Sequence, residues 1–452
     1  MRTFTNRVYE FSERAIGELM DINSEKSLSE DELENLLLNA SKKFNDKGKR
    51  PKFFTIEGHN LKFRNYVGFL RIENYQFEIL PKIWKKGEND EDKSETIENF
   101  TKFFVYGNLK PNELDKYFES GLKHKYTSFL NMLVHLYVIS LERELQEGPY
   151  FEYVEIEEKA KFLKGRLDLN KQINSIDKSN FHVRYYDHSY DNHLNRNLLF
   201  ATEYVEDNYL FPINESRLPY LINMFPENIS DIPEWDFREF HFNRLNERFE
   251  VPYNYADLIV NGNVFSHNKS RKYYSFLYDM NRLFEQFIAN LIIRNSSTIF
   301  GLDFPIKNIQ VQKESKNFLY KGDEATRKTI LDIFVELPSH KKIIIDTKYQ
   351  IMGDSEDSNE DDSKNSHLYQ LFTYSKLYKA DLALIIYPLE VNGHAGSENE
   401  GINDSGRNRE TYTFEKGGST KFKMCGIPMD LSGDRKIWEN RLVKNLRECL
   451  CD

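Results

Sequence analysis

The chain has 452 residues, with 62 Lys and Arg against 72 Asp and Glu, and a formal net charge of −10. This length predicts roughly two to four domains, each large enough to bury a core. The hydrophobic fraction of 39% and the aromatic fraction of 14% exclude a wholly disordered chain. The acidic balance excludes a protein that coats nucleic acid by bulk charge, although it leaves room for a local basic groove.

Three cysteines near the C-terminus are too few and too clustered for a disulfide scaffold or a four-ligand zinc site. They are Cys425, Cys449 and Cys451. The first residues lack the apolar run of a secretory signal. The most apolar stretch, from Phe129 to Leu141, is interrupted by Asn131 and His135 and is too short to span a bilayer. We therefore expect a soluble, cytoplasmic protein with no membrane contact.

The first part of the chain, residues 1–160, mixes short strands and helices and is predicted to form an α+β domain. A helix is expected to open at Ser29, because an acidic first turn precedes a series of leucines. Two strands, Tyr66–Ile72 and Tyr75–Leu80, are expected to pair as a hairpin. The basic loop over residues 42–52 has two interpretations: a solvated hairpin tip, or a probe that contacts an acidic partner or a nucleic-acid backbone.

Residues 161–270 are predicted to form a middle connecting region. A helix is expected from Leu194 to Val205, because its apolar residues recur at helical spacing. Four prolines between residues 212 and 233 indicate a loop-rich stretch of short elements. A group of potential metal ligands precedes this helix, but its spacing matches no closed zinc site, and turn and capping roles are favoured. The group comprises Asp187, His188, Asp191 and His193.

Residues 271–452 have the clearest pattern. An amphipathic helix is expected around Met280–Leu291, whose apolar side chains form one stripe. The elements expected after it are strands over 329–337 and 342–349, a helix over about 366–379, a strand over 382–387 and a C-terminal helix. This order predicts an α/β domain on a mixed sheet. The whole chain is therefore expected to be a multidomain protein of mixed α+β class.

Two aspartates lie in the strands joined through Pro338-Ser339-His340. If that hairpin is symmetric about Ser339, Asp332 and Asp346 face each other across adjacent antiparallel strands, with Cβ atoms roughly 4.5–5.5 Å apart. Lys348 projects on the same side as Asp346, because side chains alternate by face along a strand. The sequence thus places two carboxylates and one ammonium group on one small patch.

This patch is predicted to catalyse metal-assisted phosphodiester hydrolysis. Asp346 follows an unbroken apolar run, where an unpaired carboxylate is costly, and Asp332 and Asp346 together offer ligands that suit Mg²⁺. Lys348 is expected to polarise the scissile phosphate or orient the attacking water. The alternative interpretation is a buried Asp–Lys ion pair. Glu285 and Gln370 are further catalytic candidates, with ordinary surface residues as their alternative.

These residues, in this order of elements, resemble the PD-(D/E)xK nuclease superfamily, with Leu331 where that pattern often has proline. More specifically, the chain resembles the McrC family, the nuclease subunits of modification-dependent McrBC restriction systems. The segments that carry this resemblance are Val67-Gly68 through Glu78-Ile79-Leu80-Pro81-Lys82-Ile83, Gly165-Arg166-Leu167-Asp168, Asn195-Arg196-Asn197-Leu198-Leu199, Leu283-Phe284-Glu285-Gln286-Phe287 and Asp346-Thr347-Lys348-Tyr349.

The resemblance implies that the chain is the Mg²⁺-dependent DNA endonuclease subunit of a GTP-dependent restriction complex directed at modified cytosine. It also implies a hexameric, McrB-like AAA+ GTPase partner, which the N-terminal part enters and stimulates, double-stranded DNA as substrate, and dimerisation within the complex. The sequence agrees with a separate motor chain, because it has no G-x-x-x-x-G-K-[ST] phosphate-binding segment.

Two other functions fit parts of the sequence. The first is a non-catalytic assembly module that activates an AAA+ GTPase and carries a vestigial nuclease fold. The presence of Asp332, Asp346 and Lys348 together argues against it. The second is a stand-alone nuclease of the same superfamily, against which the acidic surface argues, because unaided capture of DNA would be opposed by repulsion.

Overall fold

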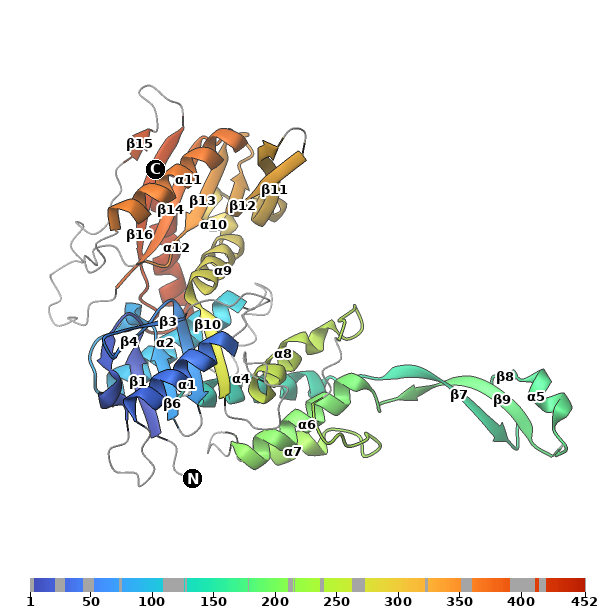
Figure 1. Ribbon diagram of the computed structural model, residues 1–452. Coiled ribbons are helices and arrows are strands. Elements are labelled where there is room, and N and C mark those ends of the chain that lie inside the picture. The colour runs from blue at the N-terminus through green and yellow to red at the C-terminus, as the bar shows by residue number, and fades with distance from the viewer. Residues whose placement is uncertain are drawn as a thin grey trace. The chain divides into compact units, whose positions relative to one another are not determined.

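The computed structural model shows a mixed α+β chain whose elements are drawn in Figure 1. The residues it describes are 4–20, 29–43, 53–72, 75–108, 126, 128–177, 179–209, 214, 216–235, 240–261, 273–321, 324–350, 360–390, 411–413 and 420–451. Within them, no helix combines the length and the apolar character that a membrane span requires.

The chain forms two compact units. The first contains residues 1–129 together with 266–452, and the second contains residues 130–265. The predicted mixed α+β, multidomain class is confirmed. The boundaries expected at residues 160 and 270 concern the roles of successive parts of the chain, and they stay a prediction.

A four-stranded sheet forms the N-terminal part of the first unit. Its strand order is β1-β6-β5-β10, with bounds Phe4–Tyr9, Tyr75–Leu80, Tyr66–Ile72 and Tyr273–Asp279. The predicted β5–β6 hairpin is confirmed at both strands. β10 pairs with β5 so closely at Gly68, whose φ is +131°, that a Cβ there would lie 2.0 Å from the Phe276 carbonyl oxygen. Only glycine fits this position.

A second, three-stranded sheet and two helices complete this part. The sheet order is β2-β4-β3, and the bounds are β2 Glu13–Ala15, β4 Asn60–Phe63, β3 Phe54–Glu57, α1 Glu30–Lys43 and α2 Asp90–Asn108. The predicted start of α1 is confirmed: Ser29 Oγ accepts from the Glu32 N–H at 3.3 Å, and the Glu32 carboxylate accepts from the Ser29 N–H at 2.8 Å. This reciprocal pair satisfies two amides that the first turn leaves open.

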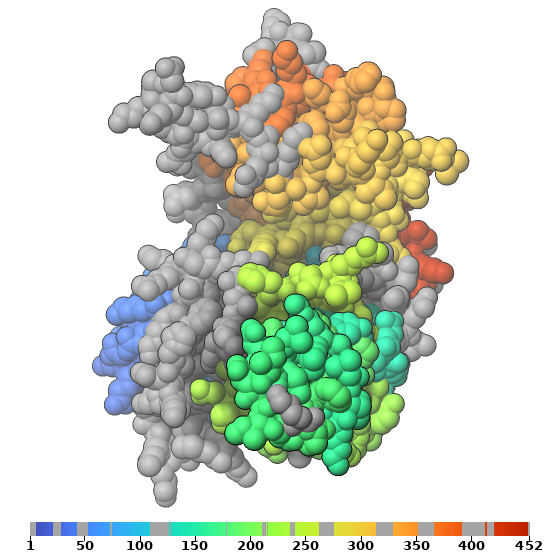
Figure 2. Space-filling model, turned by 90° about the vertical axis from the view of Figure 1, so that its right-hand side faces the viewer, coloured from blue at the N-terminus to red at the C-terminus, as the bar shows by residue number. Residues whose placement is uncertain are grey.

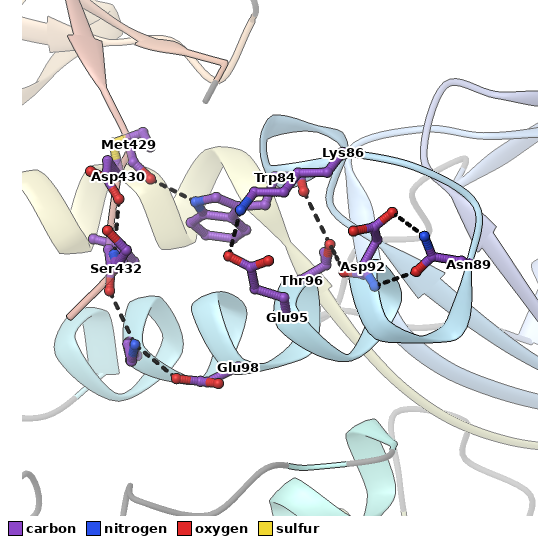
Figure 3. Close-up of polar contacts among 12 residues, drawn as sticks. Trp84, Lys86, Asn89, Asp92, Glu95, Thr96, Glu98, Met429, Asp430 and Ser432 are labelled. Atoms are coloured by element: carbon purple, nitrogen blue, oxygen red, sulfur yellow. Dashed lines mark hydrogen bonds and ion pairs between the residues drawn. The ribbon is translucent and has the colours of Figure 1, made fainter. Parts of the chain in front are cut away.

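The start of α2 is tied to the C-terminal part of the same unit, as Figure 3 shows. Asn89 Oδ1 accepts from the Asp92 N–H at 2.8 Å and so caps the helix. The buried indole of Trp84, just before α2, donates from Nε1 to the Met429 carbonyl at 2.6 Å. Thr96 Oγ1 donates to the Trp84 carbonyl at 3.1 Å, so α2 holds the tryptophan from its other side.

The second unit combines helices with a long, narrow arm. Its helices are α4 Phe129–Gln146, α6 His193–Asn208, α7 Arg217–Asn223 and α8 Glu250–Val260. The arm consists of β7 Glu152–Ala160, β8 Arg166–Leu167, α5 Leu169–Asn174 and β9 Phe181–Ser189. β7 and β9 run antiparallel along its whole length, and α5 and β8 form its free end (Figure 1), which faces the viewer in Figure 2.

A six-stranded mixed sheet forms the C-terminal part of the first unit. It is the mixed sheet with helices that the sequence predicts for this part of the chain. Its order is β11-β12-β13-β14-β16-β15, with bounds Ile309–Lys321, Glu324–Glu336, Lys342–Thr347, Leu382–Leu389, Lys421–Pro428 and Thr411–Thr413. The helices are α9 Met280–Arg294, α10 Ser296–Phe300, α11 Glu360–Tyr378 and α12 Arg435–Cys451. Parallel pairing joins β13, β14 and β16, and antiparallel pairing joins the outer strands.

Three strands of this sheet were not expected from the sequence. β11 carries a largely polar sequence, because it is an edge strand that borders only β12. β15 and β16 extend the other side beyond β14. The predicted helix around Met280–Leu291 is confirmed as α9, and all its stripe residues are buried. α11 packs Leu371 and Tyr378 against Ile344 and Ile385 of the sheet.

Candidate active site

The β12–β13 hairpin sets the geometry of the site. Its turn is closed by the Leu337 N–H donating to the Lys341 carbonyl at 2.8 Å. The register pairs Ile333 with Ile345, so that Asp332 and Asp346 come next along the two strands. This is the register expected from symmetry about Ser339, and the prediction is confirmed.

The carboxylate of Asp332 is held by the residue that follows Asp346. Its Oδ2 atom accepts from the Thr347 N–H at 2.8 Å and from the Thr347 hydroxyl at 3.1 Å. Two donors on one oxygen fix the direction of the carboxylate and favour its charged form. The other oxygen of Asp332 takes part in neither bond.

Asp346 lies deeper, with 3% of its surface exposed, at the end of an apolar strand that is buried on both faces. Lys348 forms an ion pair with it, with Nζ 2.7 Å from Oδ2. The Lys348 backbone is itself fixed, because its N–H donates to the Ile386 carbonyl of β14 at 2.9 Å. The predicted grouping of Asp332, Asp346 and Lys348 on one patch is therefore what the structure shows.

The electrostatics of this patch disfavour two bare carboxylates. Burial and the charge of Asp332 together raise the pKa of Asp346 to about 6, against the opposing effect of Lys348. Burial likewise raises the pKa of Asp332, against the hydrogen bonds from Thr347 and the charge of Lys348. One lysine thus does not balance the two acids, and an additional positive charge would stabilise their charged forms.

Glu285 on α9 adds a third carboxylate to the same neighbourhood. Burial and the charges of Asp332 and Asp346 raise its pKa to about 7, against the opposing effects of Gln312 and Arg282. Gln312 donates its side-chain amide to Glu285 Oε1. The charges of both aspartates thus act on the pKa of Glu285, which distinguishes it from a glutamate on a distant surface. In the part of the chain that the structure describes, no three His, Cys, Asp or Glu side chains are arranged to hold a metal together.

Gln370 lies on α11, half-buried, and its Nε2 donates to the Tyr374 hydroxyl at 3.1 Å. The next residue, Leu371, packs in the core between α11 and the sheet face that includes Ile344. Asp346 lies on that face, because it comes two residues after Ile344 within β13. Gln370 therefore belongs to the helix that covers this sheet face, and its hydrogen-bond partner is Tyr374.

Two residues near the patch were not expected from the sequence. Burial and the charge of Lys348 lower the pKa of His367 on α11, and its buried Nδ1 has no hydrogen bond within the described residues. Burial and the charge of Asp346 raise the pKa of Tyr387 on β14 to about 12. The Tyr387 hydroxyl is likewise buried without a hydrogen bond among the described residues. One feature of the sequence could have indicated His367: it lies one helical turn before the candidate residue Gln370.

Two residues that follow Asp187 in the sequence, Asp191 and Asn192, have structural roles. Asn192 Oδ1 caps α6 by accepting from the Asn195 N–H at 3.0 Å, as expected. Asp191 pairs with Arg196 through both carboxylate oxygens, at 2.5 and 2.7 Å. Cys425 and Cys449 are buried and unbonded to each other.

Comparison with known proteins gives the chain a family. Residues 61–388 match the family described as "McrBC 5-methylcytosine restriction system component". No curated protein matches the chain. Among solved structures, the chain is similar to one in the "Refined half-complex from tetradecameric assembly of Thermococcus gammatolerans McrB AAA+ hexamers with bound McrC". That pair has 23% identity and a TM-score of 0.63, over 99% of this chain and 99% of that chain.

A second similar structure is the "Cryo-EM structure of the Thermococcus gammatolerans McrBC complex", with 26% identity and a TM-score of 0.48. That match covers 65% of this chain and 88% of the other. The first structure shows a shared fold along the whole chain, which agrees with the resemblance read from the sequence. Because the family match covers more than half of the residues, this chain belongs to the family of McrBC 5-methylcytosine restriction system components.

Proposed function

We propose that the chain is the DNA-cleaving subunit of a GTP-dependent restriction complex and hydrolyses phosphodiester bonds with the help of Mg²⁺. The observation that carries this proposal is the patch of Asp332, Asp346 and Lys348, in which Nζ lies 2.7 Å from Oδ2. Two acids with raised pKa values beside one lysine are costly to bury. Such perturbed groups gather at catalytic sites more often than elsewhere.

Asp332 and Asp346 would hold the Mg²⁺ ion. The donor set fits, because Mg²⁺ takes one or two carboxylates and keeps other positions for water and phosphate oxygens. The excess of acid over base at the patch supports the same assignment. When bound, Mg²⁺ supplies charge neutralisation and Lewis acidity at the scissile phosphate.

The remaining residues have separate roles in this proposal. Lys348 Nζ donates to a phosphate oxygen and stabilises the charge that develops there during hydrolysis. Glu285, whose pKa is raised to about 7, accepts a proton from the attacking water at a carboxylate oxygen. Gln370 Nε2, which also donates to the Tyr374 hydroxyl, donates to the phosphate backbone.

The partner that we propose is a hexameric, McrB-like AAA+ GTPase, with double-stranded DNA containing modified cytosine as the substrate. Membership of the McrBC family and the fold shared with a McrC chain support this assignment. The absence of a phosphate-binding G-x-x-x-x-G-K-[ST] sequence supports it as well, because the energy of GTP must then be used by another chain.

We also propose that the arm of β7, β8, α5 and β9 contacts this partner and promotes its GTP hydrolysis. The arm projects from the helices of the second unit, and its free end exposes large apolar side chains, such as Ile173 at 72% and Phe162 at 66%. Exposed apolar groups gathered in this way mark interaction sites. The loop over 42–52, another expected contact, lies outside the described residues from residue 44 onward.

The proposal is tested with the reconstituted complex and DNA that carries methylated cytosine. Cleavage is expected to require both GTP and Mg²⁺, and the Lys348→Ala complex is expected to hydrolyse GTP normally without cutting. If the wild-type complex were to show stimulated GTPase activity and no cleavage under any metal condition, the chain would instead be a non-catalytic assembly module.

A further inference from the structure

A carboxylate far from the nuclease strands in sequence reaches the residue next to Lys348. Glu10 follows β1 of the N-terminal sheet and has 1% of its surface exposed. Its Oε1 atom accepts from the Tyr349 hydroxyl at 2.5 Å and from the Lys82 N–H at 3.3 Å. Its backbone N–H donates to the Leu80 carbonyl at 2.9 Å, so the residue is fixed to β6 as well.

Burying this carboxylate is costly and gives little back in local pairing. Burial, aided by the charge of Asp279, raises the pKa of Glu10 to about 7, against the hydrogen bonds from Tyr349 and Lys82. Its second oxygen, Oε2, is buried without a hydrogen bond among the described residues. An apolar residue at position 10 would avoid this cost. What it would not provide is an acceptor for the Tyr349 hydroxyl, and this hydrogen bond is what Glu10 adds.

Tyr349 is placed to transmit this contact to the active site. It directly follows Lys348, just after the end of β13 at Thr347. The ring of Tyr349 is buried and lies 6.2 Å, centroid to centroid, from that of Phe284, the neighbour of Glu285 on α9. Beyond it, the Gln350 N–H donates to the Lys348 carbonyl at 2.9 Å. The segment that carries Lys348 is thus fixed through the buried side chain of Tyr349.

We propose that Glu10 is a positioning residue for nucleic-acid hydrolysis: by holding the Tyr349 hydroxyl, it fixes the chain just after β13 and thereby sets Lys348 Nζ against Asp346. This inference rests on the proposed nuclease function. It makes the N-terminal sheet part of the catalytic framework, because the sheet supplies a residue that the arrangement of Lys348 depends on.

Three variants separate positioning from folding. Glu10→Ala and Tyr349→Phe remove the hydrogen bond, whereas Glu10→Gln keeps an amide oxygen that accepts from Tyr349. We expect the first two to slow single-turnover cleavage by the reconstituted complex roughly 10- to 100-fold. GTPase stimulation should stay within about twofold of wild type, and Glu10→Gln should restore most of the cleavage rate.

Trp84→Phe is the matched control. It removes another buried hydrogen bond between the N-terminal and C-terminal parts of the same unit, the one from Nε1 to the Met429 carbonyl (Figure 3). It is expected to lower the melting temperature through the loss of this bond, while cleavage stays near wild type. Wild-type cleavage by a folded Glu10→Ala complex, or an equal loss of cleavage in Trp84→Phe, would overturn the proposal.

A crystal structure of the Glu10→Ala chain gives a readout that does not depend on cleavage. We expect the distance from Lys348 Nζ to Asp346 Oδ2, which is 2.7 Å here, to exceed about 4 Å, the limit of an ion pair. An unchanged distance would overturn the positioning role. If the wild-type complex failed to cut DNA while this distance lengthened, the proposed function would fail and the positioning role would stand.

Discussion

Asp332 is oriented by Thr347, whose backbone N–H and hydroxyl both donate to the same carboxylate oxygen, at 2.8 and 3.1 Å. Thr347 stands between Asp346 and Lys348 in the sequence. The three residues 346–348 therefore contribute a carboxylate, two hydrogen-bond donors that orient Asp332, and the positive charge of Lys348. This compact division of roles accounts for the geometry of the patch and leads to the first prediction.

Thr347→Val removes the hydroxyl while keeping the β-branched shape and the backbone donor. We expect cleavage by the reconstituted complex to fall roughly tenfold, because the Asp332 carboxylate loses one of its two fixed donors. Stability should fall by about 1 kcal/mol, the usual value of one buried hydrogen bond.

Thr101→Val is the control for this variant. Its buried hydroxyl donates to the Ile97 carbonyl at 2.7 Å within α2. A similar loss of stability without a loss of cleavage is expected. Equal loss of cleavage in the two variants, measured by single-turnover gel assays, would show that the effect of Thr347 is on folding alone.

Asp332→Asn tests whether the two acids repel each other when no metal is bound. The amide oxygen still accepts from Thr347, and Asp346 keeps its ion pair with Lys348. The variant without metal is therefore expected to melt no lower than wild type, because one of two buried like charges is gone. Mg²⁺ should raise the melting temperature of wild type and leave that of the variant unchanged. A rise of equal size in both proteins would exclude Asp332 as a ligand.

Glu10 gives the protein a distinct pH dependence. Its pKa is raised in the folded state to about 7 by burial and by Asp279, against the hydrogen bonds of Tyr349 and Lys82 and the charge of Lys82. The folded protein therefore binds a proton more readily than the unfolded chain, and this contribution to stability is lost as the pH rises from the unfolded pKa, near 4.3, through 7.

Urea unfolding of wild type and Glu10→Gln measures the pH-dependent contribution of Glu10 to the free energy of unfolding. Between pH 5.5 and 8, wild type should lose roughly 2 kcal/mol relative to the variant, because other groups cancel in the difference. Parallel stability curves for the two proteins would mean that Glu10 titrates as an ordinary carboxyl.

The apolar end of the arm is expected to bind the GTPase partner. Ile173→Asp places a charge on an exposed site at the free end, so partner binding, GTPase stimulation and cleavage should fall together, without a change in melting temperature. Leu302→Asp is the control, because Leu302 is exposed on the C-terminal part of the first unit. Analytical ultracentrifugation with the partner would contradict the assignment if Ile173→Asp still assembled fully.

Much of the patch follows from local sequence, and its surroundings do not. The apolar run Ile343–Ile345 and the turn at Pro338 set the strand and its register, so the placement of Asp332 against Asp346 was predictable. The position of His367 depends on how α11 lies over the sheet. Tyr387 comes from a parallel neighbour strand, which no hairpin pattern indicates.

The contacts between residues far apart in the sequence could not be predicted either. The contact between Glu10 and Tyr349 joins residues 339 positions apart. The polar sequence of β11 lacks the alternation of a half-buried strand, because it borders a single strand at the edge of the sheet. Local propensity and pattern carry no information about such partners, which are selected when the whole domain packs.

The central claim, that Asp332, Asp346 and Lys348 form a metal-dependent nuclease centre, is tested most directly by one substitution. The measurement is the rate at which the Asp346→Ala complex, assembled with its AAA+ partner, cuts methylated DNA in the presence of GTP and Mg²⁺. We predict that cleavage falls below detection while partner binding and GTPase stimulation remain at wild-type levels. Cleavage by the variant at the full wild-type rate would contradict the assignment.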